Sequence, residues 1–250
     1  MHAPDDWYRT FFTGVALDLW RAFVTPEMTS AEADALQRYL QVEPPARLLD
    51  VPCGNGRLAI ELAVRGYVAV GVDLAGESVE EGKLEAERRG VVVDLRQGDM
   101  RDLTELGTFA GAYCWGNSFG YLEEDGNVAF LHAASAALEP GARLVLEFGT
   151  LAETALPAMQ ARSWYQAGDV LMAVANGYDL YRGRVVTEYT FVKDGVVAKR
   201  AGSQQVWTLR ELRALLLQAG FDHVEAFAHP SGEPLQLGGQ RAVVVARKAG

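Results

Sequence analysis

The feature that most constrains the fold of this chain is an alternation of strand-like and helix-like segments that begins near residue 47. The expected strands are short apolar runs, and the expected helices between them carry one apolar face. The strands are expected at 47–51, 68–72, 91–95, 111–114 and 143–148, and the helices at 58–65, 78–89 and 126–138. Such repeats have right-handed crossovers, so this part predicts a parallel sheet with helices on both faces.

The pattern changes after residue 160, where strands are expected at 169–175, 178–181, 184–193 and 196–206. Asn176-Gly177 and Asp194-Gly195 are strong hairpin signals between them. A helix at 208–219, which opens with the capping pair Thr208 and Glu211, and strands at 224–229 and 242–247 then resume the first pattern. The sequence therefore predicts an α/β fold, a doubly wound and mostly parallel seven-stranded sheet with a small antiparallel β insertion.

Composition excludes several classes of partner. The chain has 250 residues and a formal net charge of −10. A surface this acidic repels phosphate backbones, so we expect no nucleic-acid partner. No apolar run approaches the roughly 18 residues that a membrane span needs, and the acidic segment 1–6 does not resemble a signal peptide, so we expect no membrane association.

Histidine and cysteine spacing gives no sign of a metal site. His2, His132, His223 and His229 are scattered, without the spacing of metal ligands. Cys53 and Cys114 both fall at the inner ends of expected strands, where a disulfide between them is not expected. Reduced thiols are the default of a reducing compartment, so we expect a cytoplasmic protein without a bound metal.

The residues that follow the expected strands point to a ligand site, because ligands of open parallel sheets bind beyond the carboxyl ends of the strands. The first strand runs into a loop that ends at Gly54-Asn55-Gly56, in which glycine lets the backbone approach a ligand closely. Asp73 ends the second strand, about 20 residues after the loop, and is placed to accept ribose hydroxyls. Asp99 follows the third strand and can accept from an adenine amino group.

The run from Asp50 to Gly56 resembles the first motif of class I S-adenosylmethionine-dependent methyltransferases, acidic-x-Gly-x-Gly-x-Gly, except that Pro52 replaces the first glycine. Pro52 removes a backbone donor and fixes φ, so its effect on the loop is left open. The resemblance covers about residues 30–150 and resumes at 207–248. It implies an enzyme that uses S-adenosylmethionine, with S-adenosylhomocysteine as product, to methylate nitrogen or oxygen of a small molecule by in-line displacement.

The resemblance also implies which residues contact the cofactor. The methionine end would be held around the glycine loop, the ribose and adenine by residues after the second and third strands, and the amino group by a carbonyl after the fourth strand. The residues concerned are, in that order, Asp50, Cys53, Gly54, Asn55 and Gly56; Asp73, Leu74, Asp99 and Met100; and Cys114 or Trp115.

The acceptor site is expected where the loop after the fourth strand meets the insertion and an N-terminal helix. An apolar stripe of Tyr8, Phe12, Val15, Leu19 and Phe23 predicts a single helix over the site. The candidates for substrate contact are Tyr8, Trp20, Trp115, Asn117, Phe119 and Trp164, and those for a catalytic role are Asn117, Tyr121 and Glu147. Glu147 is equally a candidate base, an orienting acid or a structural residue, and we name no firm base.

These expectations divide the chain into four parts: 1–29, an N-terminal helical cover; 30–160, the cofactor-binding α/β core; 161–206, the insertion that covers the substrate site; and 207–250, the last helix and two strands of the core. The insertion resembles the covers of small-molecule methyltransferases of the glycine and sarcosine N-methyltransferase type, which disfavours a macromolecular substrate. A monomer and a homodimer both remain open.

Two other functions are compatible with part of the pattern. Gly54 to Ala59 also fits Gly-x-Gly-x-x-Gly/Ala, which would suit an NAD-dependent oxidoreductase with Asp73 on the ribose. Asp50 counts against it, because its charge would face a pyrophosphate, and Asp99 adds another carboxylate. A sulfonium cofactor tolerates these acids better. The second alternative is a cofactor-binding protein without catalysis.

Overall fold

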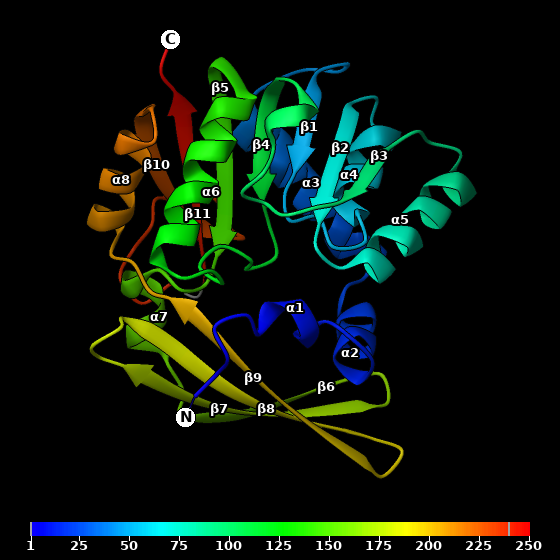
Figure 1. Cartoon of the computed structure of the whole chain (residues 1–250), viewed down its shortest axis with the longest axis vertical. Coiled ribbons are helices and arrows are strands. Elements are labelled where there is room, and N and C mark those ends of the chain that lie inside the picture. Colours follow the sequence, from blue (N-terminus) through cyan, green and yellow to red (C-terminus); the bar gives the residue numbers. More distant parts are fainter. Residues whose placement is uncertain (1, 240) are drawn as a thin grey trace.

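The computed structural model describes residues 2–239 and 241–250, and it places two β-sheets on either side of the N-terminal helices (Figure 1). The larger sheet carries most of the helices. The smaller sheet lies below it in the figure, and the short helices α1 (Tyr8–Phe11) and α2 (Val15–Phe23) lie between the two. The site described below lies where these three parts meet.

The larger sheet has seven strands in the order β10-β11-β5-β4-β1-β2-β3. Only β11 runs antiparallel to its neighbours, so the predicted fold class is confirmed. The strands are β1 (Arg47–Asp50), β2 (Val68–Asp73), β3 (Asp94–Gln97), β4 (Phe109–Cys114), β5 (Leu138–Phe148), β10 (Phe221–His229) and β11 (Arg241–Lys248).

Helices cover both faces of this sheet, which explains why its central strands are continuous apolar runs. Successive residues of one strand enter opposite layers: Leu144 joins the cluster that contains α6 and α8, and Val145 joins the cluster that contains α3. The remaining elements of the core are α3 (Pro26–Leu40), α4 (Arg57–Val64), α5 (Gly76–Arg89), η1 (Thr104–Leu106), α6 (Glu124–Ala137), α7 (Ala152–Ala158) and α8 (Leu209–Gln218). The Thr208–Glu211 capping box of α8 is confirmed.

The smaller sheet is fully antiparallel, in the order β6-β7-β8-β9. Its strands are β6 (Arg162–Ala167), β7 (Val170–Asp179), β8 (Arg184–Lys193) and β9 (Val196–Gln205). The hairpin at Asp194-Gly195 is confirmed, and both residues have positive φ (50° and 75°), as a type I′ turn requires. The strand β6 was not expected.

The hairpin predicted at Asn176-Gly177 is wrong, because these residues lie inside β7, which continues to Asp179. The side chain of Asn176 bonds to neighbours on both sides: it donates to the Gln160 carbonyl and accepts from the Thr187 hydroxyl. These cross-strand bonds hold the pair in the ladder, and the chain turns instead between Asp179 and Arg184.

Some predicted boundaries also need correction. Helix α5 begins at Gly76, so Ser78 lies buried within its first turn and does not cap it. The third strand lies at 94–97, and β5 begins at Leu138, so Pro140-Gly141 lies within it. The N-terminal stripe belongs to two helices, because the chain breaks at Gly14 (φ 54°).

Candidate functional site

The glycine loop after β1 packs directly against α5. Gly54 and Gly56 have positive φ (58° and 69°), a conformation that side chains other than glycine rarely adopt. A Cβ added to Gly82 of α5 would lie 2.3 Å from the Asn55 carbonyl oxygen. The helix can therefore pack this closely against the loop only with glycine at position 82. A Cβ on Gly54, in contrast, would meet nothing within 4 Å. The loop therefore packs against α5 on one side and is open on the side of Gly54.

Asp73 ends β2 and fixes this loop. One carboxylate oxygen accepts from the Gly54 amide (2.7 Å) and the other from the Ala75 amide (2.8 Å). Burial raises the pKa of Asp73, while the two amides favour its charged form. A carboxylate has about four lone-pair sites, so two remain for hydroxyl donors. Asp73 thus holds the loop and retains capacity for a ligand.

Asp50 ends β1 and is buried beneath the loop. Burial raises its pKa to about 8, and neighbouring Asp73 adds to the shift, although the Tyr113 hydroxyl and the Arg57 guanidinium favour the charged form. Burial thus favours the protonated form of this side chain. The side chain of Asp50 is almost fully shielded from solvent.

Asp99 follows β3 and pairs with Arg101. The Arg101 guanidinium donates to both carboxylate oxygens (2.9 and 2.6 Å), and its backbone amide donates to one of them. These contacts lower the pKa of Asp99. A ligand amino group would have to share this carboxylate with Arg101. Leu74, expected beneath the adenine, is half-buried. Met100, whose backbone amide was expected at the adenine edge, has its side chain in the hydrophobic core.

Cys114 and Trp115, at the end of β4, have buried side chains. Trp115 packs in the cluster around α3 and contacts His229 edge-to-face, with ring centroids 5.4 Å apart. Its side chain is not among those that line the pocket described below, so its expected contact with the acceptor stays a prediction that this lining does not support. Only the backbone carbonyls of these two residues remain candidates for a cofactor contact. Cys53 and Cys114 are both free thiols, as predicted.

The carboxylate of Glu147 is fully engaged by neighbouring residues, so it is not free to act as the general base for which it was a candidate. Arg241 contacts both carboxylate oxygens (2.5 and 2.6 Å), and the Gly116 and Asn117 amides donate to one of them (3.0 and 3.3 Å). Burial raises its pKa, against the opposing effect of Arg241. Of its three possible roles, the structural one fits: Glu147 fixes the backbone that follows β4.

Asn117 joins the two sheets. Its side-chain oxygen accepts from the Gly149 amide (2.7 Å), its side-chain nitrogen donates to Gln204 of β9 (3.3 Å), and its carbonyl accepts from the same glutamine (2.8 Å). It adopts a positive φ of 65°. With its amide group engaged on both ends, Asn117 positions the loop and is not free to orient an acceptor as expected.

Three further candidates lie outside the lining of the pocket described below. Phe119 is fully buried and packs against Phe148 and Phe130, so it belongs to the core. Trp164 is 67% exposed on β6 and pairs with the exposed Ala173. Tyr8 is half-buried against Trp7, outside the lining of the pocket.

A pocket does lie between the loop after β4, the N-terminal helices and the small sheet. Its lining contains three expected residues, Trp20, Asn117 and Tyr121. Sequence reasoning missed the rest: Trp7, Phe11, Phe12, Gly116, Val185, Thr187, Tyr189, Gly202, Ser203 and Gln204. The density of aromatic residues at 7–12 was a usable signal for the first three, whereas the contributions of β8 and β9 depend on register.

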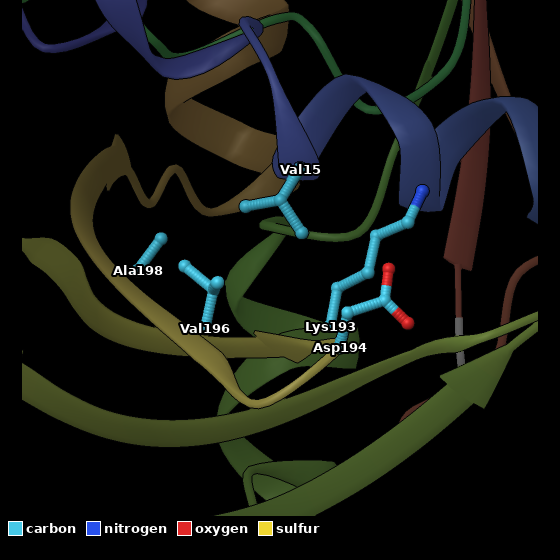
Figure 2. Close-up of a pocket in the computed structure, with 5 residues that line it drawn as sticks. All are labelled: Val15, Lys193, Asp194, Val196 and Ala198. Atoms are coloured by element: carbon cyan, nitrogen blue, oxygen red, sulfur yellow. The ribbon is translucent and has the colours of Figure 1, made fainter.

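A second, shallower pocket lies at the tip of the β8–β9 hairpin (Figure 2). It is lined by Val15, Lys193, Asp194, Val196 and Ala198. Lys193 extends toward α2, where it pairs with Asp18 (3.0 Å), so its charge is already matched. This pocket lies away from the strand ends that carry Asp50, Asp73 and Asp99, and we assign it no function.

Within 2–239 and 241–250, no group of three or more His, Cys, Asp or Glu side chains is arranged to hold a metal ion. No helix in the same ranges is long and apolar enough to cross a membrane.

A glycine loop, acidic residues at three successive strand ends and a reversed β11 in a seven-stranded sheet define a class I methyltransferase fold. Residues 48–141 match the family model described as a methyltransferase domain, and this part of the chain is therefore a methyltransferase domain. The match includes the glycine loop, Asp73 and Asp99, so it favours the methyltransferase interpretation of the loop over nicotinamide binding.

Known proteins agree with this assignment. The ubiquinone biosynthesis O-methyltransferase of Xanthomonas axonopodis pv. citri is 34% identical over 109 residues, which cover 42% of this chain and 44% of that protein. The chain thus matches less than half the length of such curated relatives. Among solved structures, the CcbJ methyltransferase of Streptomyces caelestis has a TM-score of 0.81 at 16% identity, with 99% of this chain and 100% of that chain covered. The amino pentose methyltransferase CalS10 of Micromonospora echinaspora has a TM-score of 0.69 at 21% identity and covers 95% and 98%.

Proposed function

We propose that this protein is an S-adenosylmethionine-dependent methyltransferase that acts on a small molecule. The observation that carries the proposal is the continuity of the two sites: Gly116 and Asn117, which follow the end of β4, also line the aromatic pocket. A cofactor held at the strand ends would lie at one end of this pocket and an acceptor within it.

The acidic residues at the strand ends fit a cofactor without phosphate groups. Asp50, Asp73 and Asp99 supply carboxyl groups at the ends of β1, β2 and after β3, and the side of the loop at Gly54 is open. Asp73 would accept the ribose hydroxyls, and the backbone around Cys53 to Gly56 would hold the methionine end. Bound S-adenosylmethionine supplies an electrophilic methyl group on a sulfonium.

The remaining work of this chain is alignment and exclusion of water, which can supply much of the acceleration of a displacement reaction, about 7–11 kcal/mol in favourable cases. Glu147 and Arg241 hold the backbone after β4, and Asn117 with Gln204 ties that backbone to the small sheet. Helices α1 and α2 cover the pocket from the other side. This enclosure supports a small molecule as the acceptor.

The names of related proteins leave the acceptor open. The curated relative is named for O-methylation, whereas a structural neighbour is named for an amino pentose. A net charge of −10 and two free thiols are consistent with our proposal of a cytoplasmic enzyme that does not bind nucleic acid.

The decisive experiment is calorimetric titration of the purified, ligand-stripped protein with S-adenosylmethionine, S-adenosylhomocysteine and NADH. We expect micromolar binding of the two sulfur compounds and no binding of NADH. Binding of NADH alone would replace the proposal with the oxidoreductase alternative. Binding of the sulfur compounds without methyl transfer to any member of a mixed panel of small amines, alcohols and phenols would support the non-catalytic alternative.

A further inference from the structure

The aromatic pocket has an unusual chemical composition for an active site. Its aromatic side chains form a connected cluster, in which Trp7 contacts Tyr121 (ring centroids 4.7 Å apart) and Phe11 contacts Tyr189 (5.0 Å). Phe12 stacks on Tyr121 with 23° between the ring planes. The polar lining consists of amides and hydroxyls from Asn117, Gln204, Thr187 and Ser203. None of these described lining residues is His, Asp, Glu, Lys or Arg.

This composition bears on which atom can be methylated. A hydroxyl acceptor must lose its proton in the reaction and therefore needs a base within reach. The titratable groups in the lining are the phenols of Tyr121 and Tyr189, and burial raises the pKa of each, so both stay protonated. Glu147, whose carboxylate accepts from the Gly116 and Asn117 amides, is already held by Arg241. An amine carries its own nucleophilic lone pair and needs no such base.

We propose that the acceptor is an amine, bound in this aromatic pocket, whose described lining carries no charged side chain. The proposal rests on the function proposed above. The nitrogen lone pair forms the new N–CH₃ bond while the S–CH₃ bond breaks, and the electron pair of the broken bond stays on sulfur as a neutral thioether. The nitrogen takes over the positive charge, and a primary or secondary amine then releases a proton to water.

The pocket is suited to that movement of charge. A lining without carboxylates gives an incoming ammonium no counter-ion that would hold its proton, so the proton can pass to water and free the lone pair that attacks. A lining without cations does not oppose the positive charge that arrives with the methyl group. Aromatic ring faces attract such a charge, and they do so for methylated nitrogen in particular. The pocket therefore selects an amine at entry and tolerates its cation after transfer.

The test compares two probes that differ by one atom: choline and 3,3-dimethylbutan-1-ol, in which carbon replaces the charged nitrogen. Both are titrated into the protein saturated with S-adenosylhomocysteine, and binding is followed by the fluorescence of Trp7 and Trp20. We expect choline to bind about tenfold more tightly, the scale that a desolvated cation–aromatic contact gives. Equal binding, tighter binding of the alcohol, or no binding of choline would overturn the proposal.

Two variants of α2 localise the effect. Trp20→Leu removes an aromatic ring that lines the pocket and should reduce the preference for choline severalfold. Phe23→Leu is the matched control, because Phe23 is exposed to the same degree (38% against 39%) on the same helix but does not line the pocket. Loss of the preference in both variants, or in neither, would contradict the assignment to this pocket. Tyr121→Leu provides a second pocket variant.

The experiment separates failure of this inference from failure of the proposed function. Binding of S-adenosylhomocysteine to the unmodified protein is measured first. If it does not bind, the proposed function fails. If it binds and choline shows no preference over the alcohol, only the assignment of an amine acceptor fails. In the same way, a Tyr121→Phe variant that loses methyl transfer while keeping cofactor affinity would point to a phenol acting as base and against an amine.

Discussion

The two sheets of this molecule are stabilised in different ways. Strands of the seven-stranded sheet are buried on both faces, as the adjacent residues Leu144 and Val145 show by entering separate clusters. The four-stranded sheet buries one face against α1 and α2 through residues such as Met172 and Phe191, while Leu171 on the other face is exposed. The proposed cofactor side of the site thus belongs to a sheet that is packed on both faces, where few substitutions can be accommodated. The proposed acceptor side belongs to a sheet that is packed on one face only, where more substitutions can be accommodated.

Deeply buried ionisable side chains occur in both sheets, and Asp50 of the larger sheet and Arg184 of the smaller sheet have different roles. Asp50 in the core lies beneath the glycine loop with its pKa raised by burial. Arg184 of β8 is 2% exposed and links the small sheet to the core, since it donates to Ser203 of β9 and to the Leu122 and Tyr121 carbonyls after β4. The pair offers a way to perturb each region separately.

The largest effect is expected at the junction between the sheets. Arg184→Ala leaves several buried acceptors without a donor, so we expect a loss of about 3–5 kcal/mol in the free energy of unfolding. Hydrogen exchange should rise most in β8 and β9 and least in β1 and β4. The neighbouring Arg182→Ala removes an exposed ion pair with Glu123 and should cost less than about 1 kcal/mol. Equal losses in the two variants would show that Arg184 does not join the sheets.

This division also explains how much could be predicted from the sequence. The core was predictable because its strands are continuous apolar runs that end at polar residues, and Asp50, Asp73 and Asp99 follow directly from strand ends. The small sheet was less predictable from the sequence, because one face of its strands is exposed and their apolar pattern is weaker. Asn176-Gly177 has the composition of a turn, yet cross-strand hydrogen bonds keep it in β7.

The cofactor and acceptor residues differ in the same respect. The residues expected at the strand ends can be identified from local sequence alone. The fold then places them along the edge of the larger sheet that is formed by the carboxyl ends of its parallel strands. The acceptor candidates could not be chosen without knowing which way each side chain points. Phe119 and Trp164 are aromatic, but Phe119 lies in the core and Trp164 is exposed to solvent. Glu147 and Asn117 reach the site and are then engaged by partners distant in sequence, Arg241 and Gln204.

The next effect concerns the buried acid of the core. Asp50 has its pKa raised to about 8, so the folded protein keeps a proton that the unfolded chain releases near pH 4. Stability from this residue is therefore complete below pH 4 and is lost as pH rises toward 8. Asp50→Asn should remove this dependence, which amounts to about 2–4 kcal/mol between pH 5 and pH 8.

Urea unfolding of the ligand-free protein at the two pH values measures this difference. The control is Asp94→Asn, because Asp94 lies partly exposed in β3 and pairs with Arg96, which lowers its pKa. A pH dependence in Asp50→Asn as steep as that of the unmodified protein would show that Asp50 is ionised in the fold.

A smaller effect, confined to the cofactor side, is expected at Asp73. Asp73→Ala removes the carboxylate proposed to accept the ribose hydroxyls and should weaken binding of S-adenosylhomocysteine by about 1–3 kcal/mol. Asp94→Ala on the neighbouring strand should leave the affinity unchanged. Because Asp73 also holds the Gly54 amide, Asp73→Asn serves as a second variant that keeps one acceptor for the loop. Unchanged calorimetric affinity in Asp73→Ala would refute the ribose role.

The smallest effect is expected on the outer face of the small sheet, where Trp164 tests whether the acceptor side is limited to the inner face. Trp164 is exposed, and the residue it pairs with, Ala173, is exposed as well. Trp164→Ala should therefore change the free energy of unfolding by no more than about 0.5 kcal/mol and leave choline affinity as it was. Trp20→Ala, in the pocket lining, should lower that affinity. If Trp164→Ala lowered it equally, the outer face of β6 would belong to the acceptor site, and the two faces of this sheet would not be divided between function and solvent.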